Sequence, residues 1–168
     1  MSGTDEDAAV LGVRADARRV LDDHHTIEEL CAAGMAIDGE PSVAAALFSR
    51  AWEARRDDYD ASIAAHFQAR HQSSGVETLR WNQLAVAHAE AVTDDRARPL
   101  FASLYLNLGD SYRALGRVRE GLIAVEQGLA ALGWLPAGGY HDFVEYGLQR
   151  LHDDLSRAER CTATSDVR

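Results

Sequence analysis

Apolar residues recur along most of the chain at intervals of three and four positions, with polar residues between them. This spacing places the apolar side chains on one face of an α-helix. Valine, isoleucine and threonine never cluster as they do in β-strands. The pattern therefore predicts an all-α protein, with helices over about 7–23, 26–37, 41–56, 59–71, 74–92, 99–116, 118–132 and 140–157.

Local residue choices support the predicted helix ends. Thr26 precedes Glu29, and Ser74 precedes Glu77, at the spacing of a capping box. Gly116 is suited to end a helix, because glycine readily adopts the left-handed conformation found there. Residues 1–6 are expected to be disordered, 133–139 to form a loop and 159–168 to form a loose tail.

The chain also repeats part of its own pattern. When Gly116 is placed over Gly39, about thirty residues fall into the same frame. Small and large residues then coincide: Ala32, Met35, Ala44, Phe48 and Ala51 stand over Gly109, Tyr112, Gly121, Val125 and Gly128. A string of short helices packs either as a compact bundle or as stacked hairpins, and internal repetition favours the hairpins.

This repeat resembles the tetratricopeptide repeat, in which two antiparallel helices of a 34-residue unit interlock through small and large residues. The best match is 102–135, where the first helix carries Tyr105, Leu108, Gly109, Tyr112 and Gly116. Weaker units cover about 25–58 and 59–101. The resemblance implies a single domain over 7–158, built from antiparallel helix hairpins stacked as a short right-handed α-solenoid. It would have about three repeats, capped by helices 7–23 and 140–157.

The interlocking depends on particular residue types. A small residue at Ala32 or Gly109 would let the paired helix approach closely, and an aromatic ring at Phe48 or Tyr112 would fill the adjacent gap. The tryptophans are expected to pack between helices rather than to stack on a ligand, at Trp52, Trp81 and Trp134. The last predicted helix carries the apolar residues Phe143, Val144, Leu148, Leu151 and Leu155.

Composition narrows the classes of partner. About one residue in six is alanine, every formal cation is an arginine, and the net charge of the 168 residues is −10. Nucleic acids and anionic membranes are negatively charged and bind to positively charged protein surfaces. The net negative charge of this chain therefore disfavours both as partners. Cys31 and Cys161 show no metal-ligand spacing, and no motif for a metal, a cofactor or a catalytic centre is present. An acidic N-terminus without an apolar run favours a cytoplasmic protein.

The resemblance implies where a partner would bind. Tetratricopeptide repeats usually hold a protein or peptide segment on the surface lined by the first helix of each hairpin. In this chain that surface would include Glu29, Ala33, Ile63, Phe67, Arg70, His71, Ser103, Leu106, Asp110 and Arg113. Some members clamp a terminal carboxylate with lysine, asparagine and arginine. Asn107 matches the asparagine, but the chain has no lysine, so this clamp is not expected.

A second hypothesis is a small-molecule pocket or an enzyme. Tyr59, Ile63, His66 and Arg70 share one helical face, and Arg70 could pair with a carboxylate or phosphate. Trp81 and Asn82 would complete this pocket from the next helix, and His66 or His71 would act as the acid–base group. The structural interpretation is that Tyr59 and Ile63 belong to the core and that Arg70 pairs with a nearby acidic residue. A third hypothesis is a structural homo-oligomer.

Overall fold

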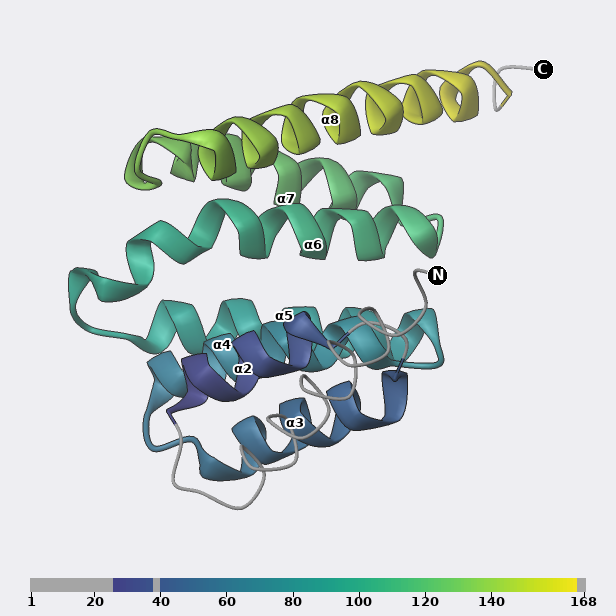
Figure 1. Ribbon diagram of the computed structural model, residues 1–168. Coiled ribbons are helices and arrows are strands. Elements are labelled where there is room, and N and C mark those ends of the chain that lie inside the picture. The colour runs from purple at the N-terminus through teal and green to yellow at the C-terminus, as the bar shows by residue number, and fades with distance from the viewer. Residues whose placement is uncertain (1–25, 38–39, 166–168) are drawn as a thin grey trace, which may run out of the picture.

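A computed structural model describes residues 26–37 and 40–165, with side chains described up to Cys161 (Figure 1). The predicted helix 7–23, the segment 1–6 and Gly39 lie outside these ranges. The described residues form α-helices and short 3-10 segments and contain no strand, which confirms the all-α prediction. The elements are α2 (Ile27–Ala36), α3 (Pro41–Ala54), α4 (Asp58–Gln68), η1 (Ala69–His71), α5 (Gly75–Ala91), η2 (Asp95–Leu100), α6 (Phe101–Ala114), α7 (Val118–Ala131), η3 (Leu132–Trp134) and α8 (Gly139–Ser165).

The predicted helix starts are confirmed by their hydrogen bonds. The Thr26 hydroxyl accepts from the backbone N–H of Glu29 at 3.2 Å, and the Glu29 carboxylate accepts from the Thr26 N–H at 2.8 Å. The Ser74 hydroxyl accepts from the N–H of Glu77 at 3.2 Å. Pro41 occupies the first turn of α3, where it removes no intrahelical hydrogen bond.

Gly116 ends α6 as predicted. Its φ angle is +71°, in the left-handed region. The N–H of Arg117 donates to the carbonyl of Tyr112 at 2.9 Å, and the N–H of Gly116 donates to the carbonyl of Arg113 at 3.0 Å. These two bonds form a Schellman motif, which satisfies carbonyl groups that the helix end would otherwise leave unpaired. The chain then reverses and enters α7.

Helices that follow one another in the sequence pack together. Contacts join α2 with α3, α4 with α5, α6 with α7 and α7 with α8, and also α3 with α4 and α5 with α6. Figure 1 shows the helices arranged in this order from α3 at one end of the molecule to α8 at the other. Contacts between alternate helices join α2 with α4 and α6 with α8. No helix in the described ranges combines the length and apolar character needed to cross a lipid bilayer.

The apolar side chains form three clusters along this arrangement. The first lies among α2, α3 and α4, with Phe48 and Leu47 fully buried. The second lies among α4, α5, α6 and α7, and the third among α6, α7 and α8, around Leu148 and Val125. Cys31 is buried in the first cluster, as expected of a small apolar residue, and burial raises the pKa of its thiol to about 12. Helices α4 and α6 each contribute to two clusters.

Small residues bring paired helices close together, as the repeat pattern predicted for Gly109. A Cβ atom placed on Gly109 would lie 2.8 Å from Val125 Cγ2 and 3.4 Å from the carbonyl oxygen of Gly121. The prediction for α2 was wrong by two positions. Ala32 is exposed and Met35 is 48% exposed.

The residue of α2 that packs against Phe48 is Gly34, where an added Cβ would lie 2.5 Å from the Phe48 ring. The buried face of α2 runs through Ile27, Leu30, Cys31 and Gly34. These four positions follow helical spacing, whereas the repeat alignment placed the small residue at Ala32. In the pair formed by α2 and α3, a small residue therefore does pack against the large ring of Phe48, but this residue is Gly34 and not Ala32.

Helix α8 is longer than predicted and buries a different set of residues. It continues to Ser165, through part of the segment expected to be a loose tail. Val144 and Leu148 are buried as core residues, but Phe143 is 68% exposed. Phe143 lies one position away from Val144, and a single residue turns a helical side chain by about 100°, which moves it out of the buried stripe.

A Gly116→Ala substitution is expected to lower the free energy of unfolding by about 1–2 kcal/mol, because alanine is strained in the left-handed region. Urea denaturation measures this change. Gly133→Ala is the matched control, since nothing lies within 4 Å of an added Cβ there and its φ is not positive. Equal stability of the two variants would contradict the assignment of Gly116 as an obligatory cap.

Replacing either of two buried serines by alanine is expected to change the free energy of unfolding, in opposite directions for the two positions. The hydroxyl of Ser62 is fully buried without a hydrogen-bond partner among the described residues, so Ser62→Ala is expected to raise the free energy of unfolding by about 1 kcal/mol. The hydroxyl of Ser111 donates to the carbonyl of Asn107 at 2.8 Å and accepts from the Asn82 amide at 2.8 Å. Because Ser111→Ala removes both of these hydrogen bonds, it should lower the free energy of unfolding by about 1–2 kcal/mol. Thermal denaturation of both variants tests the pair.

Candidate functional site

Two neighbouring cavities with polar walls open along α6. The α4–α6 cavity measures about 280 Å³ and is lined by His66, Ala69, Arg70, Thr78, Asn82, Asn107, Asp110 and Ser111. The α6–α8 cavity measures about 460 Å³ and is lined by Leu106, Asn107, Asp110, Arg113, Gly147, Arg150, Leu151 and Asp154. Both share Asn107 and Asp110, so they are neighbours along one turn of α6. We call the two cavities together the polar groove.

The polar groove contains four of the ten residues predicted for a partner surface, namely Arg70, Leu106, Asp110 and Arg113. The other six do not line it. Glu29 belongs to the capping box of α2, Ala33 packs against the first apolar cluster, and the Ser103 hydroxyl donates to the carbonyl of Leu100 at 2.9 Å. Ile63 is buried in the first apolar cluster, the ring of Phe67 stacks on Phe48 at 5.6 Å, and the ring of His71 lies 4.9 Å from Phe48. These residues of α4 and η1 pack toward α3, so they support the fold instead of lining the groove.

The alternative pocket is divided by the structure. His66, Arg70 and Asn82 line the same cavity. Tyr59 and Trp81 pack against the second apolar cluster, where the Trp81 ring meets that of Trp52 edge to face at 4.9 Å. The structural interpretation was therefore right about Tyr59 and Ile63.

That interpretation was wrong about Arg70. Arg70 makes no ion pair with an acidic residue in the part of the chain that the structure describes. Its guanidinium borders the α4–α6 cavity without a carboxylate partner. The nearest titratable group on which it acts is His66.

A chain of hydrogen bonds forms the wall of the α4–α6 cavity. The Asn82 amide, on α5, donates to the hydroxyl of Ser111 at 2.8 Å, and that hydroxyl donates to the backbone carbonyl of Asn107. The side-chain amide of Asn107 donates to His66 Nδ1, on α4, at 3.2 Å. The chain joins α4, α5 and α6, and it fixes the imidazole with Nδ1 as an acceptor.

The electrostatic state of His66 follows from this position. Burial, and secondarily the positive charge of Arg70, lowers the pKa of His66 to about 4. The imidazole is therefore neutral at pH 7, in agreement with its role as hydrogen-bond acceptor. A neutral His66 accepts a hydrogen bond well but is a poor proton donor at neutral pH.

The carboxylates of the groove are already paired, whereas two of its arginines are not. Asp110 accepts hydrogen bonds from Arg113 Nε at 2.9 Å and Nη2 at 2.7 Å. Asp154 pairs with Arg157 at 3.3 Å. Arg70 and Arg150 make no ion pair within the described segments. The groove thus presents two uncompensated positive charges on a chain of net charge −10.

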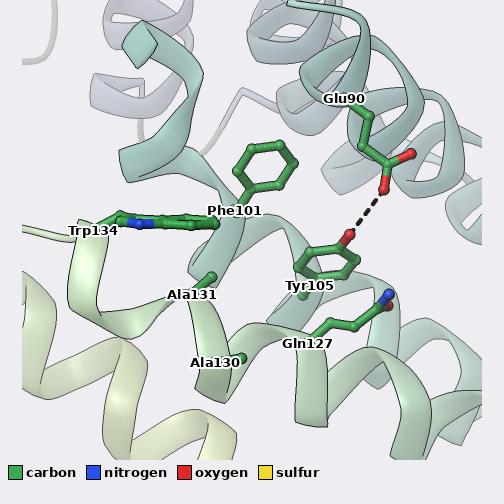
Figure 2. A pocket seen from close by; sticks show the side chains of 7 residues that line it. All are labelled: Glu90, Phe101, Tyr105, Gln127, Ala130, Ala131 and Trp134. Carbon is green, nitrogen blue, oxygen red and sulfur yellow. Dashed lines mark hydrogen bonds between the residues drawn. The ribbon is translucent and has the colours of Figure 1, made fainter.

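Two further groups of side chains were not anticipated from the sequence. One is a cavity of about 320 Å³ among α5, α6, α7 and η3, which we call the aromatic cavity and which is lined by Glu90, Phe101, Tyr105, Gln127, Ala130, Ala131 and Trp134 (Figure 2). Trp134 is 48% exposed, against the expectation that it packs between helices. The lining residues lie on four elements, and no spacing in the sequence connects them.

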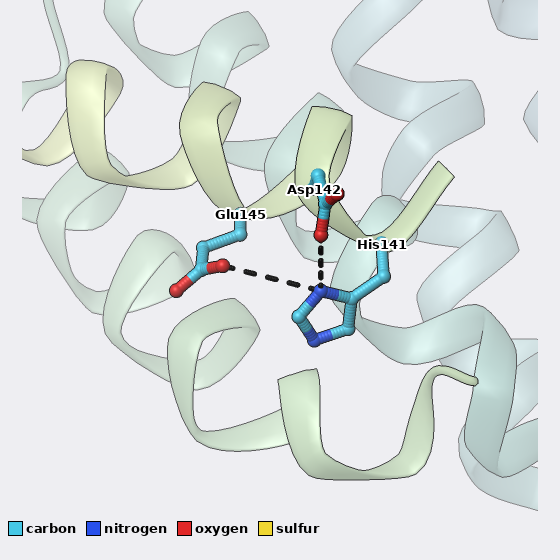
Figure 3. A group of neighbouring side chains, drawn as sticks. All are labelled: His141, Asp142 and Glu145. Atoms are coloured by element: carbon cyan, nitrogen blue, oxygen red, sulfur yellow. Dashed lines mark hydrogen bonds and ion pairs between the residues drawn. The ribbon is translucent and has the colours of Figure 1, made fainter. Parts of the chain in front are cut away.

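The other group lies in the first turn of α8. His141 Nδ1 is 3.4 Å from an oxygen of Asp142 and 3.9 Å from one of Glu145 (Figure 3). Their three donor atoms lie within 4.8 Å of one another, close enough for a metal ion. A helix N-terminus carries positive potential, which opposes a cation there. The contacts of His141 with the two carboxylates account for the arrangement without an ion.

Comparisons of this chain with models of protein families, with curated proteins and with solved structures find no match. Its function must therefore be argued from the groove and the cavities themselves.

The stability of the protein is expected to depend on pH through His66. Its pKa is 6.5 when unperturbed and about 4 in the folded chain, so between these values the unfolded state binds more protons. The stabilisation is complete above pH 6.5 and is lost as the pH falls toward 4, by up to about 3 kcal/mol. Urea denaturation at several pH values should show a weaker loss in His66→Gln. Parallel curves for the two proteins would contradict this assignment.

Proposed function

We propose that this chain is a helical-repeat binding module of the tetratricopeptide type, which holds an acidic polypeptide segment in the polar groove. The residue pattern of 102–135 and the pairing of α2 with α3, α4 with α5 and α6 with α7 support the repeat assignment. In this arrangement α4 and α6 would be the first helices of successive units, and α8 would be the capping helix. The polar groove is lined by these three helices together with η1 and α5, and the first helices are where partners of such repeats usually bind. A cytoplasmic location is part of the same proposal.

The charge distribution of the groove carries the proposal. Arg70 stands in the α4–α6 cavity and Arg150 in the α6–α8 cavity, and neither has a carboxylate partner in the described chain. Asp110, between them, is neutralised by Arg113. A guanidinium binds a carboxylate through two parallel hydrogen bonds. A segment with two acidic residues could therefore pair with both arginines while its backbone crosses α6.

The remaining groups of the groove suit the backbone and the apolar parts of such a segment. Asn107 faces both cavities and can exchange hydrogen bonds with a peptide group. Leu106 and Leu151 supply apolar surface in the α6–α8 cavity. His66 is neutral and Ser111 is engaged with Asn82, so the lining favours binding over proton transfer at pH 7.

The experiment selects random peptides by display on the purified full chain and on an Arg70→Gln/Arg150→Gln double variant. Peptides enriched on the wild-type chain are expected to contain aspartate or glutamate. Each lost charge pair should weaken the best peptide by about 10-fold or more, as measured by fluorescence anisotropy. Arg50→Gln is the matched control, because this exposed arginine of α3 lines neither cavity.

Two results would contradict the proposal. One is enrichment of peptides without acidic residues. The other is equal affinity of the double variant and the wild-type chain for the selected peptides. Sedimentation of the chain alone measures its oligomeric state. A dimer would indicate that a second copy of the chain fills the groove, whereas a monomer leaves the groove open to the peptides.

A small anionic ligand is the second candidate, because His66, Arg70 and Asn82 line one cavity of about 280 Å³. In that case a compact di- or tricarboxylate such as citrate should raise the melting temperature. Arg70→Gln should abolish the rise and Arg150→Gln should leave it intact, since only Arg70 lines that cavity. A peptide that spans the groove should depend on both arginines.

A further inference from the structure

The aromatic cavity lies apart from the polar groove and shares no residue with it. Its walls are three rings. Phe101 and Tyr105 stack at 5.9 Å between ring centroids, and Phe101 meets Trp134 at 6.0 Å with an interplanar angle of 61°. Figure 2 shows the ring of Phe101 between those of Trp134 and Tyr105. Ala130 and Ala131 of α7 add small apolar surface and leave the space open.

One carboxylate stands beside these rings. Glu90 accepts a hydrogen bond from the hydroxyl of Tyr105 at 2.9 Å, which holds the carboxylate at the edge of the cavity. Glu90 makes no ion pair with any residue of the described ranges. Its negative charge therefore has no positive counterpart within the structure.

These features define the charge of the ligand that fits. Glu90 is exposed, and a neutral apolar ligand seated beside it would displace part of the water around an uncompensated carboxylate, which is unfavourable. A cation would compensate this charge and would also interact with the electron-rich faces of the rings. The Trp134 ring already accepts such a contact, since the guanidinium of Arg98 lies 5.6 Å from its centroid. Arg98 itself does not line the cavity.

The same walls define the chemistry of the cation. An ammonium group with N–H bonds needs several acceptors when it leaves water, and here the side chains of the lining offer the Glu90 carboxylate, the Gln127 amide oxygen and the Tyr105 hydroxyl, of which Glu90 and Tyr105 are already bonded to each other. A fully alkylated ammonium has no N–H bond to satisfy and is recognised by aromatic faces. A trimethylammonium group fits easily within about 320 Å³.

We infer that the aromatic cavity binds a trimethylammonium group, with Trp134, Phe101 and Tyr105 as its walls and Glu90 as its counter-charge. The group can come from a small molecule such as choline or from a trimethylated lysine side chain of a protein. Both sources share the chemistry that the cavity recognises, and the experiment separates them.

The test titrates the full chain with choline at constant ionic strength and follows the indole N–H resonance of Trp134 by NMR. A peptide that contains trimethyllysine is the second arm, and the arm with the higher affinity identifies the source. The neutral isostere 3,3-dimethylbutan-1-ol has the same shape without the charge. It is expected to bind about 10-fold or more weakly than choline, since the charge-dependent contacts are lost.

Variants assign the effect to the cavity. Glu90→Gln keeps an acceptor for Tyr105 and removes the charge, so it should weaken binding of the cation about 10-fold without weakening binding of the neutral isostere. Glu126→Gln, an exposed residue of α7 outside the cavity, is the matched control and should have no effect. Trp134→Leu should weaken choline binding.

Three results would overturn the inference. They are equal binding of choline and its neutral isostere, unchanged choline binding by Glu90→Gln, and the absence of a saturable shift with either cation up to about 10 mM. The comparison of choline with the isostere needs only the wild-type chain, so it decides the question even if a variant fails to fold.

Discussion

Helices α4 and α6 must each bury apolar surface on two sides, and this constraint organises the rest of the molecule. Ile63 and Ala64 of α4 face the first apolar cluster, while Ala65 faces the second. Helix α6 likewise contributes Leu104 and Leu108 to the second cluster and Ala102 to the third. A helix buried on two sides keeps one narrow stripe for other contacts. Those stripes carry His66 on α4 and Asn107 and Asp110 on α6, and they form the central part of the lining of the polar groove.

The apolar clusters alone do not determine the register of α4 relative to α6. The hydrogen bonds from His66 through Asn107 to Ser111 and Asn82 join these helices and α5 at a defined register. A buried polar network is favourable only when its members are satisfied, and each of these side chains has a partner. The guanidinium of Arg70 lies at the edge of this network and makes no ion pair among the described residues. A group that we propose to bind a partner therefore lies beside groups that hold the fold together.

The sequence predicted the elements well and the side-chain environments less well, for physical reasons. Helical spacing and local caps such as Thr26 and Gly116 depend on neighbouring residues, and these predictions were confirmed. The direction of a side chain on a short alanine-rich helix is harder to predict, because alanine is compatible with both buried and exposed positions. Ala32 and Phe67 show this: one was expected to be packed and is exposed, and the other was expected in a groove and packs in the core. The aromatic cavity depends on a contact between Glu90 and Tyr105 of different helices, which no periodicity encodes.

The complete absence of lysine has a consequence for how the groove could be controlled in a cell. Lysine amines lose their charge when they are acetylated, and many binding surfaces are switched off in this way. Arg70 and Arg150 offer no amine to such enzymes, and a guanidinium keeps its charge under physiological conditions. The positive charge of this surface is thus permanent. Lysine acetylation therefore cannot neutralise the polar groove.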